Sequence, residues 1–95
     1  MSAREKATSV AVEDNDRVTI TEWRFAPGAE TGWHRHAHDY VIVYRTDAKH
    51  LVETMEGGII VEVKAGHSYF RKAGVEHNVV NAGDNEVVLV ETEIK

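Results

Sequence analysis

Three observations predict an all-β domain, an antiparallel sandwich or small barrel. From Arg17 onward the chain is a series of short runs rich in β-branched and aromatic residues, which favour strands. Turn-forming segments separate these runs and hold most of the glycines and the single proline, Pro27. No window of useful length shows the 3.6-residue apolar period of a helix. We therefore expect antiparallel strands joined by tight turns.

The elements follow in order along the chain. Residues 1–16 contain one apolar alternation, Val10 and Val12, and end in EDND, so we expect a partly disordered N-terminal arm and a turn. Residues 17–95 then form a single barrel domain, the size that 95 residues allow. Its expected strands are residues 17–26, 40–46, 50–55, 58–63, 67–71, 77–81 and 86–95.

Two of these runs are apolar on both faces, at residues 40–44 and 87–90. Such strands are covered on both sides in folded proteins. Because a domain of this size has one small interior, we expect the second cover to be another subunit and predict a homodimer.

Composition and charge exclude several classes of protein. Eleven Lys and Arg against sixteen Asp and Glu give a net charge of -5, which disfavours a nucleic-acid partner. The chain has no cysteine, which is typical of a reducing compartment. Its first residues, MSAREKATSV, contain no apolar run, so we expect neither a secretion signal nor a membrane span, and a cytoplasmic location.

The stretch WHRHAHDY, residues 33–40, places His34, His36 and His38 at every second position. In a strand, side chains at i and i+2 project from one face about 6.6 Å apart, so two neighbouring imidazoles can bind one ion. His34 and His38 would lie roughly 13 Å apart, too far to share an ion without a bend. The spacing thus allows either neighbouring pair, and it also fits ordinary strand histidines.

The wider spacing resembles the two sequence motifs of the cupin superfamily, G-x5-H-x-H-x3-4-E and G-x5-P-x-G-x2-H-x3-N. The matching residues are Gly28, His34 and His36 in the first motif and Gly66, Gly74, His77 and Asn81 in the second. The resemblance covers residues 17–95 and implies a jelly roll, or double-stranded β-helix. It also implies a divalent transition metal, iron, zinc, nickel or manganese, on His34, His36 and His77. The stretch PGAETGWHRHAHDYVIV is similar to small single-domain cupins that include β-alanine degradation proteins.

The sequence departs from these motifs at two positions. Lys72 replaces the turn proline, which costs rigidity. Tyr40 stands where the family usually supplies a glutamate ligand, and the adjacent Asp39 has the parity of the opposite strand face. We therefore expect three neutral imidazoles that leave the ion's charge uncompensated, which favours a small anionic ligand.

Tyr40 and Arg71 are the candidate catalytic residues. Tyr40 is either an inward-facing aromatic of the core or a group that donates a hydrogen bond or a proton to bound substrate. Arg71 shares strand parity with Tyr69, so it is either an anchor for a carboxylate or a surface arginine.

Other residues receive structural roles. We expect His38 at the rim of the site, and His50 and His67 at the surface. Trp23 and Phe25 are expected in the core or pocket wall, and Trp33 buried outside the pocket. The amide of Asn81 is expected to hold a turn.

The function expected from this combination is a small-molecule metalloenzyme acting on an anionic substrate. Iron would support a dioxygenase, and zinc or nickel an isomerase, hydrolase or decarboxylase. Two alternatives stay open: a non-catalytic module that binds or senses a small molecule, and a cupin that has lost its metal.

Overall fold

The computed structural model describes residues 4–95, which form nine strands and no helix. The strands are β1 (Thr8–Asp14), β2 (Val18–Phe25), β3 (His34–Arg35), β4 (Asp39–Tyr44), β5 (Ala48–Thr54), β6 (Gly57–Val63), β7 (Ser68–Arg71), β8 (Glu76–Asn81) and β9 (Val87–Ile94). Within this part of the chain, no helix is long and apolar enough to cross a membrane.

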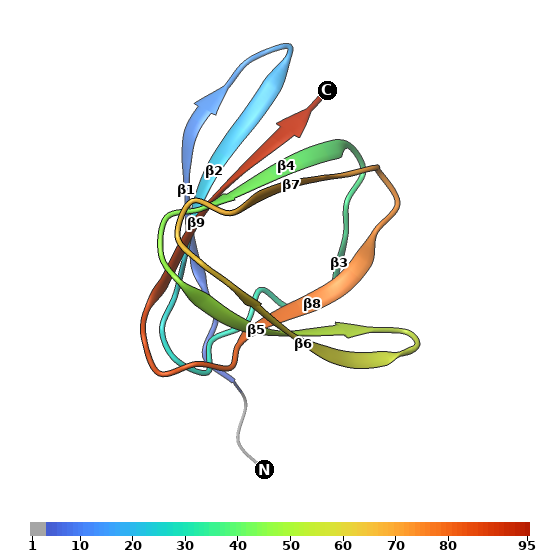
Figure 1. The fold of residues 1–95 in the computed structure, drawn as a ribbon. Helices are drawn as coiled ribbons and strands as arrows, with labels where there is room; N and C mark the ends of the chain where they lie inside the picture. The colour runs from blue at the N-terminus through green and yellow to red at the C-terminus, as the bar shows by residue number, and fades with distance from the viewer. Residues whose placement is uncertain (1–3) are drawn as a thin grey trace.

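The strands form two antiparallel sheets that face each other (Figure 1). One sheet has the order β1-β2-β9-β4-β7 and the other the order β3-β8-β5-β6, so the chain passes repeatedly from one sheet to the other. The predicted all-β, antiparallel jelly roll is confirmed, because short strands and tight turns produce this two-layer arrangement.

Part of the N-terminal arm expected at residues 1–16 is an ordered strand, at residues 8–14. These residues form β1, which pairs with β2 at the edge of the five-stranded sheet with every residue exposed. Backbone hydrogen bonds, rather than buried side chains, hold this strand in place, so its apolar pattern gives only a weak signal. Residues 1–3 of the arm lie outside the described residues.

The core lies between the two sheets. Its buried apolar members are Phe25, Ala29, Tyr40, Ile42, Tyr44, Ala48, Val87 and Leu89. The expected surface position of His50 is wrong: the residue is 1% exposed, and its Nδ1 lies 3.1 Å from the Tyr44 hydroxyl oxygen. A neutral imidazole can be buried in this way when a hydroxyl pairs with one of its nitrogens.

Trp33 also corrects the sequence prediction, because it is 55% exposed instead of buried. It precedes the two-residue strand β3, and its side chain does not line the cavities beside the core. No second layer covers that outer face of the short strand among the described residues.

Gly28 and Gly66 occupy turns with φ of 84° and 91°. An added Cβ at either position would meet nothing within 4 Å. These turns therefore need glycine because of its positive φ, a backbone conformation that other residues rarely adopt, and not because space for a side chain is lacking.

The outer face of the five-stranded sheet carries a row of apolar side chains. Val41 pairs with Phe70 and Val43 with Val90, on the face opposite the buried Tyr40 and Ile42. Val43 is 40% and Phe70 48% exposed. Both faces of β4 are thus apolar, and its outer face is open in the single chain.

Candidate metal centre

Three histidine side chains converge between the sheets. His34 on β3 lies in register with His77 on β8, and the backbone N–H of His36, just after β3, donates to the carbonyl of Val75. The Nε2 atom of His36 lies 3.0 Å from Nε2 of His34 and 3.2 Å from Nε2 of His77. The three side chains are close enough to hold one metal ion.

The protonation of these imidazoles suits a metal ion. The Nδ1 of His34 lies 2.8 Å from the carbonyl oxygen of Gly32, so Nδ1–H donates and Nε2 keeps its lone pair. Burial, followed by the charges of its histidine neighbours, lowers the pKa of His36 to about 4. Burial and the charge of His34 lower the pKa of His77 to about 4 as well. Both side chains are therefore neutral near pH 7.

The spacing of the nitrogens fits coordination. Adjacent nitrogen ligands at metal bonds of about 2.0–2.1 Å lie roughly 3.0–3.4 Å apart. Neutral imidazole nitrogens at such distances either share an N–H···N hydrogen bond or direct their lone pairs at a cation between them. The residues present therefore fit a divalent transition metal, with His34, His36 and His77 as its protein ligands.

Polar contacts fix the loop that carries His34. The backbone N–H of Gly32 donates to Oδ1 of Asn78 at 2.9 Å, and Asn78 is 2% exposed. The amide of Asn78 in turn donates to Glu30 at 2.8 Å and to Glu53 at 2.9 Å. Arg4 bridges the same two carboxylates, so the N-terminal segment braces the loop. Such outer contacts orient metal ligands.

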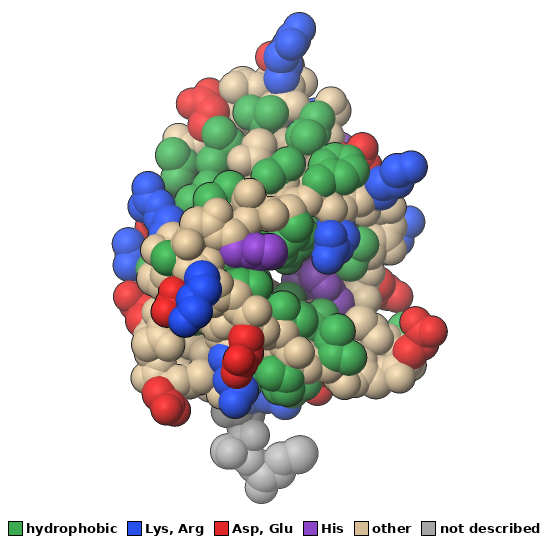
Figure 2. Space-filling model, in the orientation of Figure 1, with side chains coloured by type: hydrophobic (Ala, Val, Ile, Leu, Met, Phe, Trp, Pro, Cys, Tyr) green, Lys and Arg blue, Asp and Glu red, His purple; other side chains and the backbone are tan. Residues whose placement is uncertain are grey.

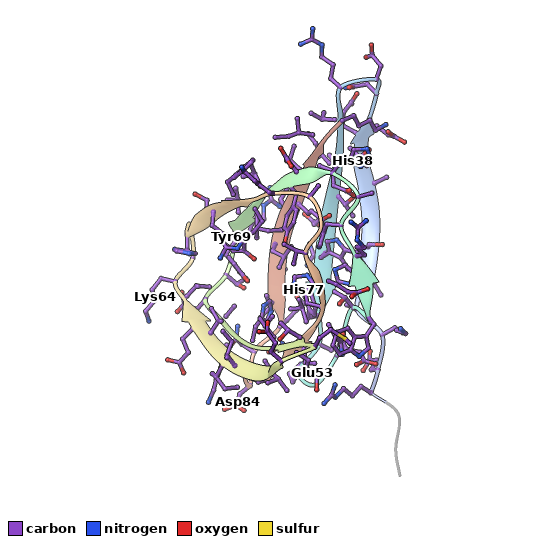
Figure 3. All side chains as sticks on the ribbon, turned by 90° about the vertical axis from the view of Figure 1, so that its right-hand side faces the viewer. His38, Glu53, Lys64, Tyr69, His77 and Asp84 are labelled. Carbon is purple, nitrogen blue, oxygen red and sulfur yellow. The ribbon has the colours of Figure 1, made fainter. Side chains whose placement is uncertain are left out.

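The histidines open into a cavity of about 290 Å³ between the sheets. In Figure 3 His77 lies inside the barrel, whereas His38 lies near its end. Figure 2 shows histidine side chains beside a hollow in one face of the molecule. A cavity of this size holds a small molecule and not a polymer segment.

Tyr40 lies directly beside the histidines. Its ring stacks on the His36 ring, with centroids 3.8 Å apart and an interplanar angle of 17°. The residue is 2% exposed and lines the cavity, yet its hydroxyl has no hydrogen-bond partner among residues 4–95. Burial raises the pKa of this hydroxyl above its ordinary value, so it remains protonated at neutral pH.

Arg71 lies outside the cavity of the histidines. Its guanidinium carbon is 4.4 Å from the centre of the Tyr69 ring, and Nη1 donates to the carbonyl of Phe70 at 3.0 Å. The exposed side chain lines a second cavity of about 200 Å³, which shares Tyr40, Tyr44, Tyr69, His77 and Val79 with the first. His77 therefore borders both the histidine cavity and the cavity that Arg71 lines.

Sequence reasoning missed two carboxylates in the cavity wall, Glu91 and Glu93 on β9. Oε2 of Glu91 lies 3.7 Å from Nδ1 of His36, and Oε2 of Glu93 lies 3.6 Å from Nδ1 of His38. Burial, reinforced by the charge of Glu93, raises the pKa of Glu91 to about 7. Together with His36, the two glutamates form a second group close enough to hold an ion.

The register of the sheet explains their position. Glu91 pairs with Ile42 and Glu93 with Tyr40, so both share the inward face of β9 with the buried Leu89. Glu91 and Glu93 follow Leu89 at every second position, and this alternation was the signal available in the sequence. When ionised, these carboxylates supply negative charge beside the histidines. That charge would partly compensate the positive charge expected of a metal ion held by three neutral imidazoles.

The other predicted positions fall around this centre. His38 is 44% exposed at the rim, and His67 is exposed, as expected. The carboxylate of Asp39 points away and accepts from the N–H of Ala73 at 2.8 Å. Asn81 holds a turn, because its amide donates to the carbonyls of Phe25 and Asn85.

The two sheets contribute different groups to the cavity. His34 and His77 lie on the four-stranded sheet, and His36 follows its strand β3. Tyr40, Tyr69 and the two glutamates lie on the five-stranded sheet. The cavity therefore has a nitrogen-rich wall facing a wall of hydroxyls and carboxylates.

The sequence is similar to those of known proteins. Residues 21–93 match the family model described as the cupin domain. Over 95 residues, the whole of both chains, the sequence is 61% identical to the β-alanine degradation protein BauB of Pseudomonas aeruginosa.

Solved structures share the fold. The crystal structure of a cupin domain from Bordetella pertussis Tohama I has a TM-score of 0.96 and 52% identity, covering 100% of this chain and 99% of that chain. The polyketide cyclase RemF of Streptomyces resistomycificus has a TM-score of 0.76 and 21% identity, covering 97% of this chain and 70% of that chain. The latter likeness concerns the fold alone.

Proposed function

We propose a function for this chain from its membership of the cupin family, to which it belongs. It is a cytoplasmic, metal-dependent protein. It binds a small carboxylate at an ion held by His34, His36 and His77. The observation that carries the proposal is the convergence of three Nε2 atoms, with neighbouring distances of 3.0 and 3.2 Å. The neutral imidazoles can donate their lone pairs to an ion without first losing a proton.

The ion would supply Lewis-acid chemistry if it is zinc, nickel or manganese, and redox chemistry with dioxygen if it is iron. The protein residues supply position and polarity. Tyr40 keeps its proton and presents an unpaired hydroxyl to the cavity, where it can form a hydrogen bond with the bound ligand. Arg71, in the adjoining cavity, places a positive charge beside Tyr69, where it can attract an anionic ligand.

The relative of Pseudomonas aeruginosa is named for β-alanine degradation. The similarity to this relative covers the full length of both chains. We therefore propose that the ligand of this chain is β-alanine or a small product of its breakdown. The cavity of about 290 Å³ suits molecules of that size.

Elemental analysis of protein purified without a histidine tag tests the metal centre. We expect about one equivalent of a transition metal per chain, and its loss in the variant that combines His34→Ala with His77→Ala. His67→Ala, an exposed histidine outside the cluster, is the matched control and should keep the metal. Metal that remains in the double variant would refute the centre.

Turnover separates an enzyme from a binding or sensing protein. Iron-loaded and zinc-loaded protein would be incubated with small carboxylates, and oxygen uptake and product formation followed. Conversion of a carboxylate supports catalysis. Saturable binding without conversion, in both metal forms, would assign the chain to the non-catalytic alternative.

We also propose that the chain forms a homodimer through the outer face of its five-stranded sheet. The exposed apolar side chains of Val43 and Phe70, beside Val41 and Val90, support this assembly. Burial of such a face against a second copy removes apolar surface from water.

A further inference from the structure

We propose that Glu91, Glu93 and Tyr40 form a subsite for an ammonium group, so that the ligand is a small zwitterion with one carboxylate and one primary amine. The ammonium lies against the wall of the five-stranded sheet, and the carboxylate faces the ion on the opposite wall. Only the position of the carboxylate rests on the proposed function, because the ammonium subsite consists of side chains that are present without an ion.

The two carboxylates lack a strong positive partner. Among residues 4–95, the ion-pair contacts of Glu91 and Glu93 are with His36 at 3.7 Å and His38 at 3.6 Å, and neither glutamate pairs with a lysine or arginine. The Glu91 side chain is 13% exposed and the Glu93 side chain 29% exposed. A partly buried carboxylate pair gains from a neighbouring cation, and a ligand ammonium would supply that charge.

Tyr40 provides independent support for a ligand at this place. Although the residue is 2% exposed, its hydroxyl has no hydrogen-bond partner in the described part of the chain. It is not sealed within the protein, because it lines the same cavity as the two glutamates. An ammonium group has three donors, which matches two carboxylates and one hydroxyl oxygen.

The remaining wall also suits a cation. Trp23 lines the same cavity as the two glutamates. The face of an indole ring attracts an ammonium group through its quadrupole. Aromatic rings next to carboxylates therefore favour an amine over a neutral or anionic group at this end.

The distance across the cavity limits the length of the ligand. Glu91 lies 3.7 Å beyond Nδ1 of His36, whose Nε2 faces the proposed ion. Adding the width of the imidazole ring and a metal bond of about 2.1 Å places the ion and the Glu91 carboxylate at most about 8 Å apart. A chain of one to a few methylene groups between amine and carboxylate fits this span, which favours short aliphatic amino acids.

The first experiment tests the ammonium subsite without metal. In a Trp33→Phe background Trp23 is the only tryptophan, so its fluorescence reports on the cavity. We expect n-propylammonium to change this fluorescence saturably, and propan-1-ol, a neutral molecule of similar size, to bind at least about tenfold more weakly. Glu91→Gln and Glu93→Gln should each remove the preference, and Glu56→Gln, at an exposed turn position, should keep it.

The second experiment compares β-alanine with propionate on zinc-loaded protein by calorimetry. We expect β-alanine to bind at least about tenfold more tightly, and Glu93→Gln to reduce that advantage to nearly nothing while zinc content and propionate affinity stay unchanged. Because Glu93 is the more exposed of the pair, its variant should fold, which circular dichroism would verify.

Equal affinity for the amine and its neutral counterpart would overturn the subsite, as would a preference that survives both substitutions. A second zinc per chain that disappears in Glu93→Gln would also overturn it, because the carboxylates would then hold metal. Failure of the metal centre gives a different result: no bound metal, but unchanged selectivity for propylammonium. That result would overturn the proposed function and support the ammonium subsite.

Discussion

Acidification should destabilise the protein through its buried histidine, His50. This residue is 1% exposed, its Nδ1 pairs with the Tyr44 hydroxyl, and its Nε2 has no hydrogen-bond partner among residues 4–95. Burial lowers the pKa of His50 to about 4, whereas a histidine in the unfolded chain titrates near 6.5. Between these values the unfolded chain binds more protons, so the stabilisation is complete above about pH 6.5 and is lost as the pH falls towards 4.

The size of the effect follows from the two pKa values. Proton linkage gives a loss of unfolding free energy of about 2 kcal/mol at pH 5 and about 3 kcal/mol at pH 4. A domain of this length is expected to have a total stability of about 5–14 kcal/mol. Protonation of one side chain would thus remove a substantial share of the stability.

Urea unfolding of metal-free protein at pH 7 and pH 5 measures this loss. We expect the difference between the two pH values to be about 2 kcal/mol smaller in His50→Leu than in the natural chain. His36 and His77 titrate in both proteins, so their contribution cancels in the comparison. His67→Gln, which changes an exposed histidine, should preserve the full pH dependence. Equal losses in His50→Leu and the natural chain would refute the assignment.

Three further predictions concern the cavity, a turn and the outer face. Tyr40→Phe should retain bound metal and change the urea-unfolding free energy by less than about 1 kcal/mol, because the hydroxyl has no protein partner; a larger loss would reveal one. Gly28→Ala should lower the unfolding free energy by about 1 kcal/mol or more, because φ is 84°; an unchanged midpoint in urea would contradict this. In size-exclusion chromatography with light scattering, the natural chain should be a dimer at micromolar concentration and Phe70→Glu a monomer, and a monomeric natural chain would exclude the assembly.

The fold could be predicted from the sequence because alternation and turn residues are local signals. The expected strand at residues 17–26 corresponds to β2, and the expected strand at 77–81 to β8. β1 could not be recognised, because it pairs with β2 through its backbone and buries none of its side chains. Backbone pairing leaves little trace in an apolar pattern.

The site was only partly accessible to sequence reasoning. The spacing of His34, His36 and His77 follows a family motif, and the structure brings these residues together. Glu91 and Glu93 were missed, because which face of β9 points inward depends on its neighbours in the sheet. His50 was misassigned for a similar reason: its partner, Tyr44, lies on another strand of the opposite sheet.

The separation of the cavity into two walls has a consequence for the diversification and redesign of this protein. The histidines proposed to hold the ion belong to one sheet or its connecting loop, and the groups proposed to select the ligand belong to the other. Substitutions at Tyr40, Glu91 or Glu93 can therefore alter the preferred ligand while the ion and its chemistry stay unchanged. A library confined to three positions on two adjacent strands would explore new substrates without rebuilding the metal centre.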